Sequence, residues 1–216
     1  MKKTTFIIIV LGLLGILCLL VLSSGCGVKE GRFSGVVTLR SKYLALKESE
    51  VDTMLKKYGF FDSRKNKRQD FPNQFELIEQ KKEAQFKRNA NSTVESIVRD
   101  KTTGLVWLQS GSNDPMPMGE AIRWRDELNK MGYGGYNTWR IPTLEEAASL
   151  IESRMVKKRH IDPIFSSLQY SIYTGDRYFD YQKNYFWGIS FASGRIIKMT
   201  ITEPNYLRLV TEYASK

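Results

Sequence analysis

The spacing of apolar residues predicts a helix over residues 118–131. Its apolar positions recur every three or four residues, so they share one face of a helix. They are Ala121, Trp124, Leu128 and Met131. Gly132 follows directly and is a natural stop, because glycine readily adopts the left-handed conformation that ends helices.

A second, shorter helix is predicted to begin after Thr143. Thr143 and Glu146 have the spacing of a capping box, in which the hydroxyl and the carboxylate satisfy the first free amides of a helix. The helix would bury Leu144, Ala148 and Ile151. Just before it, we expect Trp139 to be buried and Arg140 to have a partner. Residues 134–151 are therefore interpreted as architectural rather than as a chemical site.

The first third of the chain is less regular. Residues 33–39 ("FSGVVTL") suggest a strand, and residues 47–58 suggest a helix capped by Ser49. The helix would bury Val51, Leu55 and Tyr58 on one face. Turn residues punctuate 59–80, which predicts a loop that leads into a strand or short helix.

Short strands are expected in the rest of the chain. Residues 92–112 predict a hairpin whose turn, Lys101–Gly104, follows Asp100. After about residue 168 the chain alternates between apolar runs and turns, including a turn at Ala192–Gly194. The four runs are "YSIYTGD", "NYFWGISF", "RIIKMTI" and "YLRLVTEY". This mixture of separate helices and short strands indicates the α+β class.

The N-terminus carries an export signal. After Met1, two lysines precede a run from Thr4 to Gly25 without charge, and Ser23-Ser24-Gly25-Cys26 follows its apolar part. Three interpretations compete: a plain signal peptide, an uncleaved membrane anchor, and a lipoprotein signal in which Cys26 receives the lipid. We favour the lipoprotein signal, with residues 1–26 removed or modified at Cys26. All three place residues 27–216 outside the cytoplasm.

Charge and cysteine content narrow the chemistry. The only cysteines are Cys18 and Cys26, so residues 27–216 contain neither a disulfide nor a thiol nucleophile. The formal net charge is +10. In the envelope this favours acidic polysaccharide, anionic lipid or the cell wall as partners over nucleic acid. The alternative is that the charge only aids solubility.

Catalytic and metal-binding constellations are sparse. The single histidine, His160, follows a cationic run, and we expect it at the surface. With one histidine and no mature cysteine, a zinc site lacks ligands. Glu145 and Glu146 are explained by a helix start. Turn roles also explain Asp114, Asp162, Asp176 and Asp180. We therefore expect no cofactor and no enzymatic activity, and a carboxylate-dependent hydrolase remains an alternative.

Aromatic and basic side chains give the clearest binding signal. Aromatic residues crowd 170–187, and aromatic faces stack on sugars and anchor protein interfaces. We assign Trp187 to the core and expect Tyr178 and Tyr181 to be exposed ligand-binding candidates. We also predict an anion-binding rim that consists of Arg154, Lys157, Lys158 and Arg159.

The second half of the chain resembles the Lcl C-terminal-like domain family, which is named for a collagen-like adhesin. The resemblance rests on "VRDKTTGLVWLQSGS", "NTWRIPTLEEAASLIE", "IDPIF", "YTGD", "YFWGISFASGRI" and "YLRLV", in that order. It implies a domain over residues 94–216, preceded by a tether and accessory segment over 27–93. The mainly structural motif positions are Asp100, Thr103, Gly104, Trp107, Trp139, Arg140, Pro142, Thr143, Glu146, Trp187, Phe191, Gly194 and Arg208.

The resemblance also implies a fold and a function. The fold is similar to C-type lectins, with two helices and short twisted antiparallel strands. The adhesin implies binding of sulfated polysaccharide and formation of oligomers. Tyr173 stands where a tryptophan is usual, which marks it as a surface aromatic and a further ligand-binding candidate. We expect a lipid-anchored envelope protein, in the outer rather than the inner membrane, that binds a glycan or a protein. An assembly protein without a small ligand is the alternative.

Overall fold

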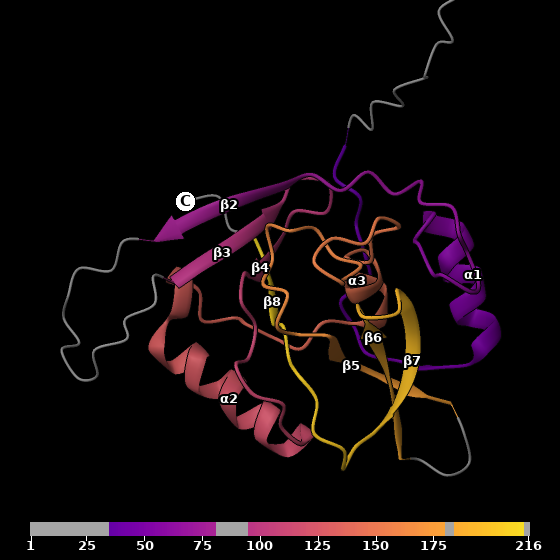
Figure 1. The fold of residues 1–216 in the computed structure, drawn as a ribbon. Coiled ribbons are helices and arrows are strands. Elements are labelled where there is room, and N and C mark those ends of the chain that lie inside the picture. The colour runs from indigo at the N-terminus through magenta and orange to yellow at the C-terminus, as the bar shows by residue number, and fades with distance from the viewer. Residues whose placement is uncertain (1–34, 81–94, 180–183, 214–216) are drawn as a thin grey trace, which may run out of the picture. The chain divides into compact units, whose positions relative to one another are not determined.

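The computed structural model describes residues 35–80, 95–179 and 184–213, and these belong to one compact unit. The fold contains two four-stranded sheets with the orders β1-β5-β6-β7 and β2-β3-β4-β8 (Figure 1). The first sheet runs through β1 (Ala45–Leu46), β5 (Ser171–Tyr178), β6 (Tyr185–Ser190) and β7 (Arg195–Thr200). The second runs through β2 (Phe75–Gln80), β3 (Glu95–Asp100), β4 (Leu105–Leu108) and β8 (Val210–Glu212). The predicted α+β class is confirmed.

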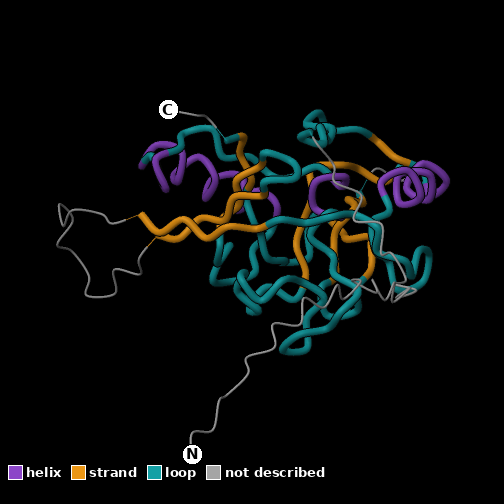
Figure 2. The backbone as a smooth tube through the Cα atoms, turned by 90° about the horizontal axis from the view of Figure 1, so that it is seen from above, coloured by secondary structure: helices purple, strands orange, loops and turns teal. Residues whose placement is uncertain are grey.

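Pairing within the sheets is antiparallel except at one edge. β1 runs parallel to β5, with Ala45 opposite Arg177 and Leu46 opposite Tyr178. β2 and β3 form a long ribbon that runs outward from the rest of its sheet (Figure 2). The predicted β3–β4 hairpin is confirmed, and Gly104 adopts φ +71° in its turn. The turn at 191–194 between β6 and β7 is confirmed as well.

The helices are α1 (Glu48–Tyr58), α2 (Met118–Met131) and α3 (Leu144–Ala148), with a 3-10 turn, η1, over Tyr133–Gly135. In both backbone views α1 and α2 lie at opposite sides of the fold (Figures 1 and 2). All three predicted helices are confirmed, and Gly132 ends α2 with φ +63°. The N-cap of α1 is Lys47, so the prediction of Ser49 is wrong. The reason is that Glu50 reaches back and accepts a hydrogen bond from the Lys47 amide at 2.7 Å.

Residues 35–39 do not form the strand that their sequence suggested. Among the described residues no strand pairs with this segment, and the Val37 amide instead donates a hydrogen bond to the Thr102 carbonyl at 2.7 Å. The chain then continues as an extended arm into β1. The strand predicted around 206–213 begins only at Val210.

Two apolar clusters form the core. One cluster surrounds Trp107 and Trp187, and α1 contributes Val51, Met54 and Leu55 to it. The other surrounds Trp139 and includes Ile97, Tyr173 and Leu207. Burial of Trp139 and Trp187 confirms both predictions. Because α1 shares the first cluster with the strands, residues 35–80 pack as part of the same unit as residues 95–179 and 184–213.

Candidate anion-binding surface

Residues 152–160 fold into a small hairpin whose turn consists of two lysines. Val156 and Arg159 exchange both main-chain hydrogen bonds, at 2.8 and 2.9 Å. Between them, Lys157 has φ +49° and Lys158 has φ +62°. A two-residue connection with positive φ at both positions normally takes Asn-Gly, since a side chain with a Cβ is strained there. Each such residue costs about 1–2 kcal/mol, so this turn is kept at the expense of stability.

The base of the hairpin is fixed to the core. The Glu152 amide donates to the His160 carbonyl, and the His160 amide donates to the Phe191 carbonyl at 2.7 Å. The His160 ring hydrogen-bonds the Glu152 carbonyl through Nδ1 at 2.8 Å and stacks on Phe61. His160 is therefore half-buried and structural, rather than a free surface histidine as predicted. The lysine tip projects from a rigid base.

A second basic segment lies against this hairpin. The loop 61–69 is organised by Asp62, a buried carboxylate that accepts hydrogen bonds from the amides of Arg64, Lys65 and Ile196. At the end of the loop, the Gln69 side-chain oxygen accepts from the Ser153 amide at 2.6 Å. Gln69 also donates to the Glu152 carboxylate. Two runs that are 84 residues apart in sequence thus lie side by side.

Together these segments form what we call the basic surface. It consists of the exposed cations Arg64, Lys67, Arg68, Arg154, Lys157 and Lys158. Within the described residues, the one ion pair among these six is Arg68 with Asp70, at 4.0 Å, and Arg68 is 85% exposed. Arg159, which we had grouped with them, turns inward and donates to the carbonyls of Ser167 and Lys158. The remaining cations are available to an anionic ligand.

The aromatic candidates do not join this surface. Tyr173 lies in the core, so the expectation of a surface aromatic there is wrong. Its ring packs in the cluster of Trp139, its hydroxyl donates to the Glu203 carbonyl, and burial raises its pKa to about 12. Tyr181 lies outside the described residues.

Tyr178 is only partly exposed and already has partners. Its ring meets the edge of Trp187 at 5.3 Å, and the Lys198 ammonium lies 3.8 Å from the ring centroid. Lys198 also pairs with Glu48 at 2.9 Å. Tyr178 therefore helps to attach α1 to the sheet, and this contact occupies the ring face that a sugar would need.

The predicted architecture before α3 is present. Thr143 caps the helix by accepting from the Glu146 amide at 3.2 Å, and Glu146 accepts from the Thr143 amide at 2.8 Å. Arg140 donates to both Glu146 oxygens. The Trp139 indole donates to the Tyr133 carbonyl at 2.8 Å. A family model described as the Lcl C-terminal domain matches residues 96–211.

The chain belongs to the Lcl C-terminal domain family. Comparisons of the whole chain with solved structures and with curated proteins found no match. Of the three α-helices in the described residues, α2 and α3 lie inside the Lcl match, whereas α1, β1 and β2 precede it. The packed unit is therefore larger than the Lcl match.

The remaining Lcl motif positions are mostly packed within the domain. Trp107 and Phe191 are buried, and Gly194 approaches the His160 ring. Asp100 is buried and accepts from the Thr102 amide at 2.9 Å and the Thr103 hydroxyl at 2.6 Å. Burial raises the pKa of Asp100, although these hydrogen bonds oppose the shift. These positions support the fold rather than a ligand.

Arg208 is a fully buried charge of the Lcl domain. Its guanidinium donates to the carbonyls of Leu108, Gln109 and Ser166 and to the Gln169 side-chain oxygen. Burial lowers the pKa of Arg208 to about 9, which leaves it charged at neutral pH. No carboxylate among the described residues pairs with it. Arg208 therefore holds the segments that carry these acceptors together.

A second buried polar network is centred on Asp176, and no sequence pattern predicted it. We had expected Asp176 to serve a turn, but it lies in β5 with a fully buried side chain. Its carboxylate accepts from both terminal nitrogens of Arg40, at 2.9 and 2.6 Å. The amides of Leu44 and Leu144 donate to it as well. A separation of 136 residues leaves no local sequence signal for this contact.

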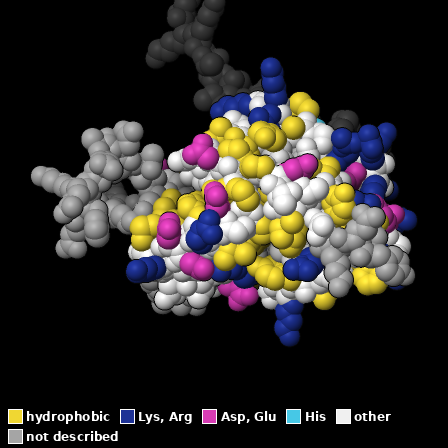
Figure 3. Space-filling model, turned by 90° about the horizontal axis from the view of Figure 1, so that it is seen from below, with side chains coloured by type: hydrophobic (Ala, Val, Ile, Leu, Met, Phe, Trp, Pro, Cys, Tyr) yellow, Lys and Arg dark blue, Asp and Glu magenta, His cyan; other side chains and the backbone are white. Residues whose placement is uncertain are grey.

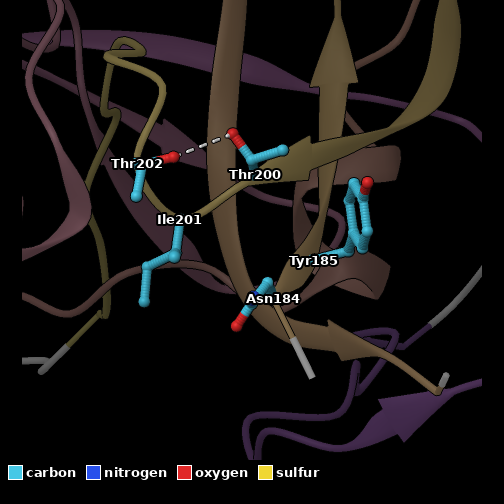
Figure 4. A pocket seen from close by; sticks show the side chains of 5 residues that line it. All are labelled: Asn184, Tyr185, Thr200, Ile201 and Thr202. Atoms are coloured by element: carbon cyan, nitrogen blue, oxygen red, sulfur yellow. Dashed lines mark hydrogen bonds between the residues drawn. The ribbon is translucent and has the colours of Figure 1, made fainter. Parts of the chain in front are cut away.

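Other surface features offer less to an anionic ligand. An open hollow of about 320 Å³ lies beside β6 and β7, and its lining carries no charged side chain (Figure 4). It is lined by Asn184, Tyr185, Thr200, Ile201 and Thr202. Within the described ranges, no three His, Cys, Asp or Glu residues are grouped to hold a metal ion. In the same ranges, no helix is long and apolar enough to cross a membrane.

Proposed function

We propose that this protein is a non-enzymatic, lipid-anchored envelope protein that binds an acidic polysaccharide through the basic surface. The observation that carries the proposal is the hairpin tip. Lys157 and Lys158 both hold left-handed backbone conformations, and both side chains are exposed without an ion pair in the described part of the chain. Local strain of this kind persists where the surrounding structure enforces it, and it collects at ligand sites.

The geometry suits a polymer better than a single small anion. All six cations are exposed, and they are spread over two segments that meet at the Gln69–Ser153 hydrogen bond. Each exposed contact contributes little by itself, about 0.5–1 kcal/mol. A polyanion engages several contacts at once, and the rigid base of the hairpin lowers the entropy that binding must overcome. Sulfated-polysaccharide binding by the adhesin that names the family is consistent with this ligand class.

The wider setting is part of the same proposal. The Ser23–Cys26 pattern supports lipid attachment at Cys26, which lies outside the described residues, and outer-membrane residence is favoured. A C-type-lectin-like fold for the matched domain is also proposed. The two short helices and antiparallel strands of that domain are compatible with it.

The test replaces the two tip lysines by the residues that the turn prefers. Lys157→Asn/Lys158→Gly removes both charges and keeps the turn. We expect about tenfold weaker binding to a sulfated polysaccharide and to polygalacturonate, because two contacts of about 0.7 kcal/mol are lost. The wild type should not bind neutral dextran. At high salt it should not bind the acidic polymers either, because salt screens the charges. The matched control is Lys56→Gln/Lys130→Gln, which removes two exposed lysines near the ends of α1 and α2. Equal loss in both variants would show that only net charge matters.

An assembly role without a small ligand is the second candidate, and exposed apolar residues favour it. Leu44 is 48% exposed, Phe179 52% and Ile201 38%. Figure 3 views the fold from below relative to Figure 1, and hydrophobic side chains gather in the middle of that face. Capture of one envelope protein that is lost in a Leu44→Ser/Phe179→Ser variant, without any polysaccharide binding, would favour this role.

A further inference from the structure

The arm, residues 36–46, lies outside the family match and yet is seated on the matched domain. It is extended, and its hydrogen bonds resemble those of an added strand. The amides of Arg177 and Phe179 in and after β5 donate to the carbonyls of Leu44 and Leu46, both at 2.9 Å. Strand addition at a sheet edge is a common way in which domains bind extended peptides.

Arg40 is the main polar contact of the arm. Its guanidinium forms the two-pronged pair with Asp176, and bidentate Arg–carboxylate pairs are among the strongest and most specific of hydrogen-bonded contacts. The main chain of Arg40 is hydrogen-bonded to the matched domain as well. The Arg40 amide donates to a Glu145 oxygen at 2.7 Å, and its carbonyl accepts from the Thr143 hydroxyl at 2.8 Å.

Tyr43 is the second anchor, and Gly175 makes room for it. A Cβ placed on Gly175 would lie 2.2 Å from the nearest atom of the Tyr43 ring, so only glycine allows this approach. The Tyr43 hydroxyl donates to the Ile141 carbonyl at 2.7 Å. Next to it, the Leu44 amide donates to Asp176 at 2.6 Å.

Most of the groups that receive the arm come from two short stretches of the matched domain, Ile141–Glu145 and Gly175–Phe179. We infer that these stretches form a docking site for an extended peptide of the pattern Arg-x-x-Tyr, and that residues 36–46 are its occupant within this chain. Much of the arm is held by polar contacts. Val36 is 63% exposed and Tyr43 45%, while Leu39 and Leu46 are its buried apolar residues. Segments with few buried apolar contacts open without global unfolding.

The test is peptide binding by the full-length chain with a loosened arm. In the Arg40→Ala/Tyr43→Ala variant, a fluorescent peptide of residues 36–47 should bind at least tenfold more tightly than it binds the wild type, whose own arm fills the site. The same peptide with alanine at both anchor positions should not bind. Adding Gly175→Ala to the loosened variant should abolish binding, because the new methyl group occupies the space of the tyrosine ring.

The inference is overturned by the following result. The loosened variant keeps its native circular dichroism, but it prefers the natural peptide over the alanine-substituted peptide no more than the wild type does. If the variant does not fold, amide hydrogen exchange on the wild type decides. Val37, Arg40 and Leu44 amides should exchange well before those of β6, through release of the arm alone. Exchange of both groups at one common rate would show that the arm is an inseparable part of the core. Neither result depends on the polysaccharide-binding proposal, which concerns other residues.

Discussion

Arg140 and Glu146 form a bidentate ion pair, with nitrogen–oxygen distances of 2.7 and 2.6 Å, across the start of α3. The Glu146 side chain is 1% exposed and the Arg140 side chain 22%. The same carboxylate accepts the Thr143 amide, so one side chain completes both the ion pair and the helix cap. This pair explains why tryptophan, arginine, proline and glutamate are crowded into this segment without forming a catalytic site.

Removing the carboxylate charge should therefore be costly. We expect Glu146→Gln to lower the free energy of unfolding by about 3–5 kcal/mol, because it leaves the largely buried Arg140 without its counter-charge. The measurement is urea unfolding followed by tryptophan fluorescence. Glu145→Gln, which changes a neighbour whose carboxylate contacts Arg40 of the arm, serves as the comparison and should lose much less. Equal losses would argue against the assigned role of Glu146.

The lysine turn should become more stable when its charges are removed. Lys157→Asn/Lys158→Gly gives the turn residues that tolerate positive φ. We expect a gain of about 1–2 kcal/mol in the free energy of unfolding, mainly from Lys158→Gly, because asparagine keeps a Cβ. Thermal unfolding would measure this gain. If this variant also binds polysaccharide more weakly, the two lysines reduce the stability of the protein but contribute to binding. A loss of stability would mean that the two backbone conformations are not strained.

Local patterns were sufficient to predict most elements of this fold. Apolar spacing gave α1 and α2, the Thr143–Glu146 spacing gave the cap of α3, and turn residues gave the hairpins. The cap of α1 was misplaced because the serine at position 49 looked like the better cap, whereas Glu50 selects Lys47. The error on Tyr173 has a different origin. The surface expectation came from the family resemblance, and β5 is covered on both faces at this position, so alternation along the strand gave no contrary signal.

The long-range parts of the site could not be read from the sequence. Each half of the basic surface is visible as a charge run, but their contact depends on Gln69 and Ser153, which no local signal joins. Arg40 and Asp176 are a second example, because each looks like an ordinary surface residue in its own segment. In both cases the three-dimensional path of the chain creates the site.

Tyr173 should make the protein sensitive to alkaline pH. Its pKa in the folded state is about 12, whereas an unfolded tyrosine titrates near 10. Since the folded state favours the neutral phenol, this stabilisation is complete below about pH 10 and is lost as the pH rises toward 12. The loss should reach up to roughly 2 kcal/mol. Urea unfolding at pH 8 to 11.5 would measure it. In Tyr173→Phe the difference from wild type should shrink as the pH rises, and a constant difference would contradict the assignment.

Lipid attachment can be tested separately from the folded domain. Cys26→Ala should leave the precursor uncleaved and unlabelled by a palmitate analogue, because that position supplies the thiol that would receive the lipid. Cys18→Ala is the matched control and should be processed like the wild type. Normal labelling and cleavage of Cys26→Ala would instead indicate a plain signal peptide or a retained anchor.

Arg208 tests whether a buried charge without a carboxylate supports this fold. Replacement by methionine removes the charge and keeps an apolar chain of similar length, but it leaves the carbonyls of Leu108 and Ser166 and the Gln169 oxygen without their donor. Each buried acceptor that loses its partner costs about 1–3 kcal/mol, while relief of the desolvated charge acts in the opposite direction. Because three or more acceptors are lost at once, we expect Arg208→Met to destabilise the protein by about 3 kcal/mol in urea unfolding. Arg195→Met, at the more exposed start of β7, is the control and should change stability by less than about 1 kcal/mol. A methionine variant as stable as the wild type would mean that the charge, rather than its hydrogen bonds, dominates at position 208.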